Sequence, residues 1–334
     1  MADSSDSAAP ADRAGTPSAT GAGDPGGVDQ IRILVSFRAD SLTHDAVEIA
    51  AWLARTDFPP VRVRALSTFV RPWPATSLKK LGGKYVDWFR REARAAEKRV
   101  KAAFTDAGIP EKFWDDPVAV FADGPSEHAL ITAAADKFGA DIIAVESDDA
   151  AEKGRLKVSN TADALLHSSP RPVCLAPRKV KLSKKGVRRV NFAFLESEWD
   201  ASLPAVDSAA QLALAWRAPL RVLAFSPTGL SDTPLSKSLD LAGELAADWR
   251  EHSLAMLDRV RDQLAAKYPE LLLESSVATG NGWGGAVDSL KWKKGDLLCL
   301  TSSPAGPLER VFVGSTTSEF LPHVGVPVVI YPTR

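Results

Sequence analysis

The stretch Gly295–Pro332 reads GDLLCLTSSPAGPLERVFVGSTTSEFLPHVGVPVVIYP, and its pattern is the strongest indication of the fold. Its continuous apolar run Leu297–Leu300 predicts a strand buried on both faces, and a loop rich in Ser, Pro and Gly follows. Gly314-Ser315-Thr316 then opens a segment with helical spacing, and Val326–Ile330 is a second buried strand. In a strand–loop–helix–strand unit, a ligand lies at the carboxyl end of the first strand, against the helix N-terminus.

The same unit occurs earlier in the chain, as GADIIAVESDDAAEKGRLKVSNTADALLHSSPRPVCLAP at Gly139–Pro177. Its first strand, Asp141–Val145, matches Asp296–Leu300, and Ser159-Asn160-Thr161 stands where Gly314-Ser315-Thr316 stands. Such a long internal repeat predicts that the architecture is built twice.

Composition indicates an ordinary globular chain. It has 334 residues with 41 basic and 42 acidic side chains, so we expect no nucleic-acid partner. No apolar run approaches the roughly 18–20 residues of a membrane span, and no apolar segment follows Met1. We therefore expect no membrane association and a cytoplasmic location. Cys174 and Cys299 fall in predicted strands and are expected to be buried free thiols.

Four segments are predicted. Residues 1–29 form a disordered tail, since they hold almost no large apolar side chains. Residues 30–178 and 189–334 form two domains, joined by a basic linker at residues 179–188. Each domain is predicted to have five strands separated by four helices, which predicts an α/β fold: two repeated open parallel five-stranded sheets with helices on both faces.

For two of these helices the sequence also predicts the limits, and for one of them the buried side chains. The spacing predicts a long helix from about Lys80 to Ala107, and a helix over Ala286–Trp292 after the glycine-rich turn Gly280–Gly285. The side chains expected to form the buried stripe of the long helix are Tyr85, Phe89, Ala93, Ala96, Val100 and Phe104.

From Ile31 to Pro332 the chain resembles the universal stress protein family, as a tandem pair. The segments that carry the resemblance are Ile33–Val35, Asp123–Glu127, Gly139–Ile143, Pro170–Val173, Leu220–Leu223, Gly295–Leu298, Gly314-Ser315 and Pro327–Val329. The resemblance implies a Rossmann-like fold with strand order 3-2-1-4-5 in each domain. It also implies a contact through the fifth strands, so that the two domains form a pseudo-dimer.

ATP-binding members of the family carry an Asp after the first strand and a G-x2-G-x9-G-[ST] loop after the fourth. Arg38 and Leu195 stand at the two Asp positions. In the first domain Ser159-Asn160 replaces the Gly-Ser pair; in the second, Gly314-Ser315 survives, but Thr301 and Pro304 replace the earlier glycines. Pro304 removes an N–H donor, and Leu195 cannot accept a hydrogen bond.

These departures predict a non-catalytic stress-response or regulatory protein with at most a weak adenine-nucleotide site, for ATP, in the second domain. The residues expected to form that site are Thr301, Ser302, Gly306, Gly314, Ser315 and Thr316. No catalytic or metal-ligand pattern stands out in the sequence.

Two alternatives remain open. One is a weak ATPase, for which Glu196 is the nearest acidic residue in the sequence. The other is a ligand-free scaffold for a transporter or signalling partner, with homodimerisation beyond the pseudo-dimer also open.

Overall fold

The structure is a computed structural model that describes residues 30–41, 43–56, 59–71, 82–195, 202–228, 241–302 and 315–332. The predicted disordered tail, residues 1–29, lies outside the described residues. In the described part of the chain, one sheet of ten strands runs through the molecule in the order β3-β2-β1-β4-β5-β10-β9-β6-β7-β8. Read from either outer edge, five strands follow the order 3-2-1-4-5, so the predicted order and its repetition are confirmed.

The strands of the first half are β1 (Ile31–Ser36), β2 (Val61–Val70), β3 (Trp114–Gly124), β4 (Ile142–Glu146) and β5 (Val173–Ala176). Those of the second half are β6 (Arg189–Phe194), β7 (Leu220–Thr228), β8 (Leu273–Asn281), β9 (Asp296–Thr301) and β10 (Val328–Tyr331). All pairs within a half are parallel. The halves join where β10 pairs antiparallel with β5, so the contact through the fifth strands is confirmed.

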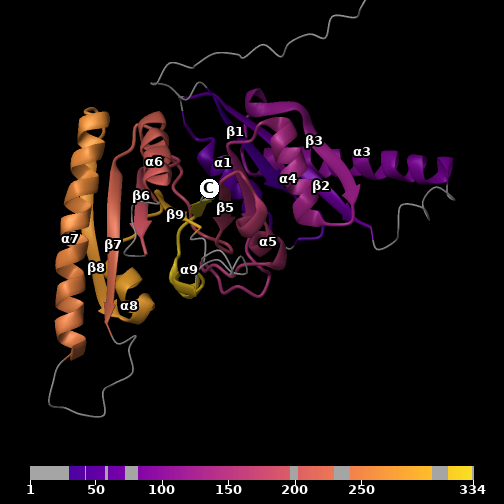
Figure 1. The fold of residues 1–334 in the computed structure, drawn as a ribbon. Helices are drawn as coiled ribbons and strands as arrows, with labels where there is room; N and C mark the ends of the chain where they lie inside the picture. The colour runs from indigo at the N-terminus through magenta and orange to yellow at the C-terminus, as the bar shows by residue number, and fades with distance from the viewer. Residues whose placement is uncertain are drawn as a thin grey trace, which may run out of the picture.

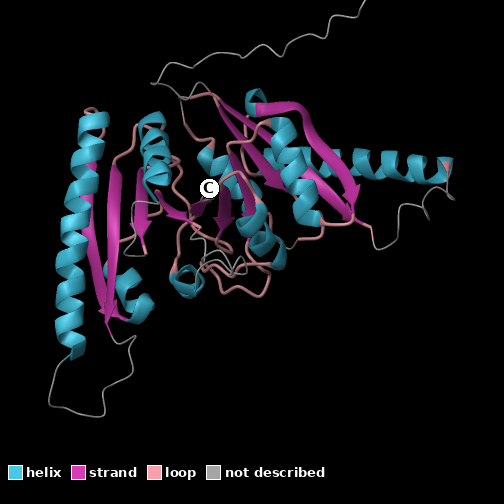
Figure 2. Cartoon of the chain, viewed as in Figure 1, coloured by secondary structure: helices cyan, strands magenta, loops and turns pink. Residues whose placement is uncertain are grey.

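Helices cover both faces of the sheet (Figures 1 and 2). One face carries α1 (Asp45–Leu53), α3 (Gly83–Asp106), α6 (Leu203–Ala215) and α7 (Leu241–Lys267). The other carries α4 (Glu127–Phe138), α5 (Asn160–Ser168), α8 (Gly282–Ser289) and α9 (Ser315–Phe320). Short 3-10 turns lie at Glu111–Phe113 and Leu321–His323.

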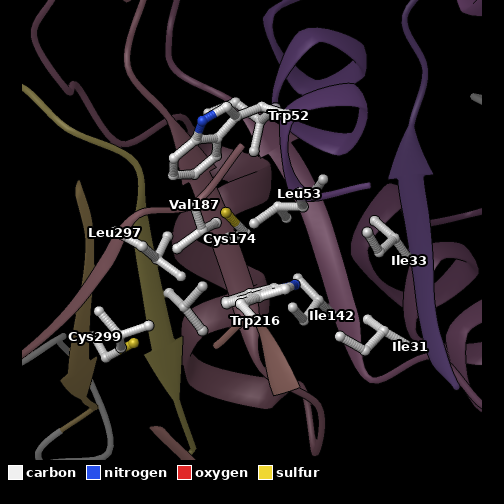
Figure 3. Close-up of a cluster of buried hydrophobic side chains, with 14 of the residues drawn as sticks. Ile31, Ile33, Trp52, Leu53, Ile142, Cys174, Val187, Trp216, Leu297 and Cys299 are labelled. Carbon is white, nitrogen blue, oxygen red and sulfur yellow. The ribbon is translucent and has the colours of Figure 1, made fainter. Parts of the chain in front are cut away.

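Alternation along each strand divides the buried side chains between two cores. Ile33 and Val35 pack under α1 and α3, whereas Leu34 packs on the opposite face under α4 and α5. Both cores run across the seam between the halves. In Figure 3, Trp52 of the first half and Trp216 of the second border the same apolar cluster, with Val187 of the predicted linker among them. Because each core is shared, the halves bury apolar surface together.

Both cysteines are buried and free, as predicted. They lie in β5 and β9 in the core between the halves, and burial raises the pKa of the Cys174 thiol to about 12. Cys174 therefore stays protonated, and its place in the core gives it a packing role.

Two helix predictions need correction. The α3 helix begins at Gly83, and its inward stripe is buried only from Ala96 onward, whereas Tyr85, Phe89 and Ala93 are half-buried. The reason is that the N-terminal part of α3 projects past the sheet edge (Figure 1). There Phe89 packs on Phe121 of β3, with ring centroids 5.0 Å apart.

The helix expected over Ala286–Trp292 begins earlier, at Gly282, and ends at Ser289. The glycines make this possible because Gly280 lies against the backbone of Gly285. A Cβ on Gly280 would stand 2.2 Å from the Gly285 carbonyl carbon, so this close approach of strand and helix requires glycine.

Candidate functional site

The fold creates two equivalent positions at which a ligand could bind, one in each half of the chain. The strand order reverses between β1 and β4, and again between β6 and β9, so a crevice opens at the carboxyl ends of each pair. In the first half the residues after these strands are Arg38 and the segment that begins at Glu146; in the second half they are Leu195 and the segment that begins at Thr301.

Carboxylates dominate the first of these places. Glu146 ends β4, and Asp148 and Asp149 follow after Ser147. Asp45, at the start of α1, is close enough to Glu146 to affect its titration. Four acidic side chains at the end of β4 and the start of α1 disfavour a phosphate group in the first crevice, and Lys157 and Arg38 offset part of this charge by pairing with Asp148 and Asp149.

The polar groups around Glu146 are already paired with one another. The Ser41 hydroxyl donates to Glu146 Oε2 at 2.8 Å, and the Thr43 hydroxyl donates to Asp45 Oδ2 at 2.6 Å. The Asp45 carboxylate also accepts the backbone N–H of Lys179 at 2.9 Å. Burial raises the pKa of Glu146 to about 7; the charge of Asp45 raises it as well, and the Ser41 hydrogen bond lowers it.

The N-terminus of α5, where the family motif would hold phosphates, uses its hydroxyls internally. Ser159 caps the helix by accepting the backbone N–H of Ala162 at 3.2 Å. The Thr161 hydroxyl donates to Glu127 Oε2 at 2.5 Å, and Glu127 Oε1 accepts from Thr68. These bonds occupy the hydroxyls that would otherwise meet a ligand.

Arg38 lies at the edge of the first crevice. Its guanidinium is 3.8 Å from an Asp40 oxygen and 3.5 Å from an Asp149 oxygen. The partners of Arg38 are therefore Asp40 and Asp149. Since the Arg38 side chain is 40% exposed, both contacts are weak surface pairs.

The loop after β4 rests on the second half of the molecule. Arg155 donates a hydrogen bond to the main-chain carbonyl of His323, in the 3-10 turn that follows α9. A cavity of about 660 Å³ lies between the two segments, lined by Leu156 and Lys157 on one side and by Leu321 and Pro322 on the other. The loop that would cradle phosphates in the first half thus contacts the other half.

The second crevice is less acidic in its described part. Thr301 ends β9, and its hydroxyl lies 3.2 Å from that of Ser202, just before α6. The backbone N–H of Ser302 donates to the Tyr331 carbonyl at 2.8 Å. Thr301 also lines a cavity of about 650 Å³ that extends toward Asp141 and Arg171 of the first half.

The remaining predicted site residues are only partly visible. Ser315 and Thr316 begin α9, as the strand–loop–helix–strand prediction required, and their side chains are not described. Gly306, Gly314 and Glu196 lie outside the described residues. The structure brings Thr301 and Ser302 together at the end of β9, and the assembly of all six residues stays a prediction.

Sequence reasoning missed Glu146 as a feature of the first crevice. The signal was present, because the apolar run Ile142–Val145 ends directly at Glu146, and two more acids follow within three residues. Ser41 and Asp45 carried no such signal, since their part depends on how the loop after β1 folds back over β4. Within the described ranges, no cluster of His, Cys, Asp or Glu side chains could hold a metal ion. Nor does any described helix combine the length and apolar character that a membrane crossing requires.

Comparisons with known proteins agree with this architecture. Residues 194–332 match the model of the universal stress protein family. A curated universal stress protein of Mycobacterium tuberculosis H37Rv is 25% identical over 303 residues, which are 90% of this chain and 99% of that protein. A universal stress protein of Mycobacterium bovis matches to the same extent.

Solved structures show the same fold. The crystal structure of a universal stress protein from Archaeoglobus fulgidus has a TM-score of 0.59 at 15% identity, and the match covers 91% of this chain and 98% of that one. A putative universal stress protein from Pseudomonas aeruginosa has a TM-score of 0.50 at 17% identity, covering 90% and 92%. The family model thus covers the second half of this chain, and over 90% of its length the chain is similar to curated universal stress proteins.

Proposed function

We propose that the chain is a non-catalytic regulatory protein of the stress response, with at most one weak adenine-nucleotide site, in its second half. The observation that carries this proposal is the state of the first crevice. Glu146 there is bonded to Ser41 at 2.8 Å, with further carboxylates beside it, so that a nucleotide phosphate would meet negative charge. The names of the curated relatives support the assignment to the stress response.

The second half keeps only the last part of the phosphate-binding motif. The Gly314-Ser315 pair survives in the sequence, and the helix N-terminus at Ser315 presents main-chain N–H groups. In this proposal Ser315 and Thr316 bind phosphate through their N–H groups and hydroxyls. Thr301 and Ser302 line the same loop, and Gly306 and Gly314 let the backbone approach the ligand.

Calorimetric titration with ATP and Mg²⁺ tests the proposal, using wild-type protein, Gly314→Val and Glu146→Gln. We expect one ATP per chain for the wild type, no binding by Gly314→Val, and unchanged binding by Glu146→Gln. Valine at position 314 would block the close approach of backbone and phosphate, whereas Glu146 belongs to the other crevice. Two ATP molecules per chain would contradict the proposal, and the absence of binding at millimolar ATP would leave the scaffold alternative.

The weak-ATPase alternative is separated by measuring phosphate release from bound ATP. The non-catalytic proposal expects a rate indistinguishable from that of ATP without protein. Release that disappears in Glu196→Gln while ATP still binds would replace the proposal with an ATPase in which Glu196 orients the attacking water.

A further inference from the structure

A cavity of about 890 Å³ lies away from both crevices. It opens where Val61 and Arg62 begin β2, at the end of the strand opposite to the crevice. The C-terminal turn of α1 forms one wall, and Trp216 with Arg217, between α6 and β7, forms another. Residues 184–188 of the predicted linker close it, so that both halves and the segment between them contribute.

The charged side chains that line this cavity are all basic in the described part of the chain. The first half supplies Arg55, Arg62 and Lys112, and the second half supplies Arg217. The linker segment adds Lys184, Lys185 and Arg188. We call the cavity bounded by these seven cations the basic cleft.

Most of these cations have no carboxylate close by among the described residues; the exception is Arg55, whose charge acts on Glu48 and lowers the pKa of that carboxyl against the larger effect of burial. Arg62 donates to the main-chain carbonyls of Lys112 and Trp114, at 2.9 and 3.1 Å, and Arg55 donates to the carbonyl of Ser183 at 3.3 Å. No described ion pair involves any of the seven. The chain as a whole has a formal net charge of -1, so this excess of positive charge is local. The cations repel one another, and a bound anion would relieve that repulsion.

Hydrogen bonds hold the linker segment against both halves. The Ser183 N–H donates to the carbonyl of Lys294 at 2.8 Å, and the Arg188 N–H donates to that of Gly295 at 2.7 Å. Gly186 lies so close to the first half that a Cβ there would stand 2.3 Å from the Arg55 carbonyl oxygen. Lys184 and Lys185 therefore project from a turn whose backbone is fixed, which lowers the entropic cost of placing their charges on a ligand.

We propose that the basic cleft binds a small anion that carries at least two phosphate groups. The volume is within the range of roughly 300–1,000 Å³ that is usual for small-molecule sites. Arginines suit phosphate oxygens because their planar guanidinium donates two parallel hydrogen bonds, and lysines add point charge. Phe113 and Trp216 supply apolar wall for the remainder of such a ligand. This site goes beyond the nucleotide function proposed above and lies at the other end of the strands.

The test uses inorganic tripolyphosphate as the probe, in calorimetric titration of the full chain at low salt. We expect wild-type protein to bind one tripolyphosphate, and Lys184→Gln/Lys185→Gln to bind about tenfold more weakly or not at all. The matched control is Lys98→Gln/Lys137→Gln, which removes the same charge from exposed positions on α3 and α4. Its affinity should change less than about twofold.

Three results of these titrations would overturn the proposal, and a fourth comes from Gly314→Val. One is the absence of tripolyphosphate binding at millimolar concentration. Another is an equal loss of affinity in the linker variant and in the control, because that would show general charge attraction. The third is tighter binding of a short duplex RNA than of tripolyphosphate, with the same dependence on Lys184 and Lys185, which would assign the surface to nucleic acid.

Gly314→Val separates this site from the proposed nucleotide site. It should bind tripolyphosphate as the wild type does, even where it has lost ATP. Loss of tripolyphosphate binding in Gly314→Val, with Lys184→Gln/Lys185→Gln unaffected, would instead place the phosphates in the second crevice.

Discussion

Val329 in β10 lies opposite Cys174 in β5, in antiparallel register, and both side chains are fully buried. This pair marks the seam at which two parallel five-stranded halves become one continuous sheet. β10 is paired on both sides, with β5 at the seam and with β9 in its own half.

Proline at position 329 should therefore destabilise the protein strongly, because it removes a main-chain N–H from the middle of the sheet. We expect Val329→Pro to lower the free energy of unfolding by about 3 kcal/mol or more, measured by urea denaturation. Val329→Ala is the control, since it loses packing but keeps the N–H, and it should cost about 2 kcal/mol. Equal effects of the two variants would show that hydrogen bonding at the seam contributes little.

A second prediction concerns Asp296, whose buried ion pair makes the stability of the protein sensitive to substitution there. Arg189 donates twice to Asp296, at 2.9 and 2.7 Å, and the Asp296 side chain is 1% exposed. We expect Asp296→Ala to cost about 3–5 kcal/mol of unfolding free energy, because it leaves the Arg189 charge without its buried partner.

The control for this pair is Asp136→Ala, which breaks the contact of Asp136 with Arg171 at 3.3 Å. That carboxylate is 52% exposed, so the expected cost is below about 1 kcal/mol. A cost of Asp296→Ala no larger than that of the control would mean that water replaces the lost partner.

Stability should depend on pH through Glu146. Burial raises the pKa of Glu146 from 4.5 to about 7, so between these values the folded protein binds a proton that the unfolded chain releases. The contribution of this group to stability is therefore full at low pH and is lost as pH rises through about 7.

Glu146→Gln removes this dependence. We expect the stability of the variant relative to wild type to increase between about pH 5 and about pH 8, by on the order of 1–3 kcal/mol. Urea denaturation of both proteins at the two pH values measures the difference. A constant difference across this range would contradict the raised pKa.

Alanine substitution at two glycines with positive φ separates the cost of a steric clash from the cost of backbone strain. Gly186 has φ +70° and would bring a Cβ to 2.3 Å from the Arg55 carbonyl oxygen, whereas Gly154 has φ +77° with nothing within 4 Å. Gly154→Ala should cost about 1–2 kcal/mol, from strain alone. Gly186→Ala should cost at least about 1 kcal/mol more, because the linker turn must move away from α1. Thermal unfolding of the two variants measures both losses of stability. Equal losses would mean that the linker turn can shift away from Arg55 without a cost in free energy.

Short segments of the sequence were enough to predict much of the fold. Runs such as Leu297–Leu300 are apolar at every position, which suits only strands covered on both faces, and their repetition at Asp141–Val145 predicted that the architecture occurs twice. Strand order and the contact between the fifth strands followed from the resemblance, and the register of β5 on β10 agrees with it.

The limits and the burial of helices were predicted less well where contacts with other elements determine them. Tyr85 and Phe89 have the spacing of a buried stripe, but they lie at the outer edge of the sheet, against β3, and stay half-buried. Sequence spacing holds no information about where that edge lies. At α8 the glycine-rich stretch looked like a turn, whereas contact between Gly280 and Gly285 lets the helix start within it.

Residue type and short-range spacing were enough to predict the order of elements, the buried strands and the departures from the family's nucleotide motif at Arg38 and Leu195. The folded structure was needed to show that Glu146 meets Ser41 across the crevice, and that Arg55, Lys185 and Arg217 line one cavity. The physical reason is that charge interactions act through space. Residues far apart in the chain acquire their electrostatic environment only when the sheet and the linker bring them together.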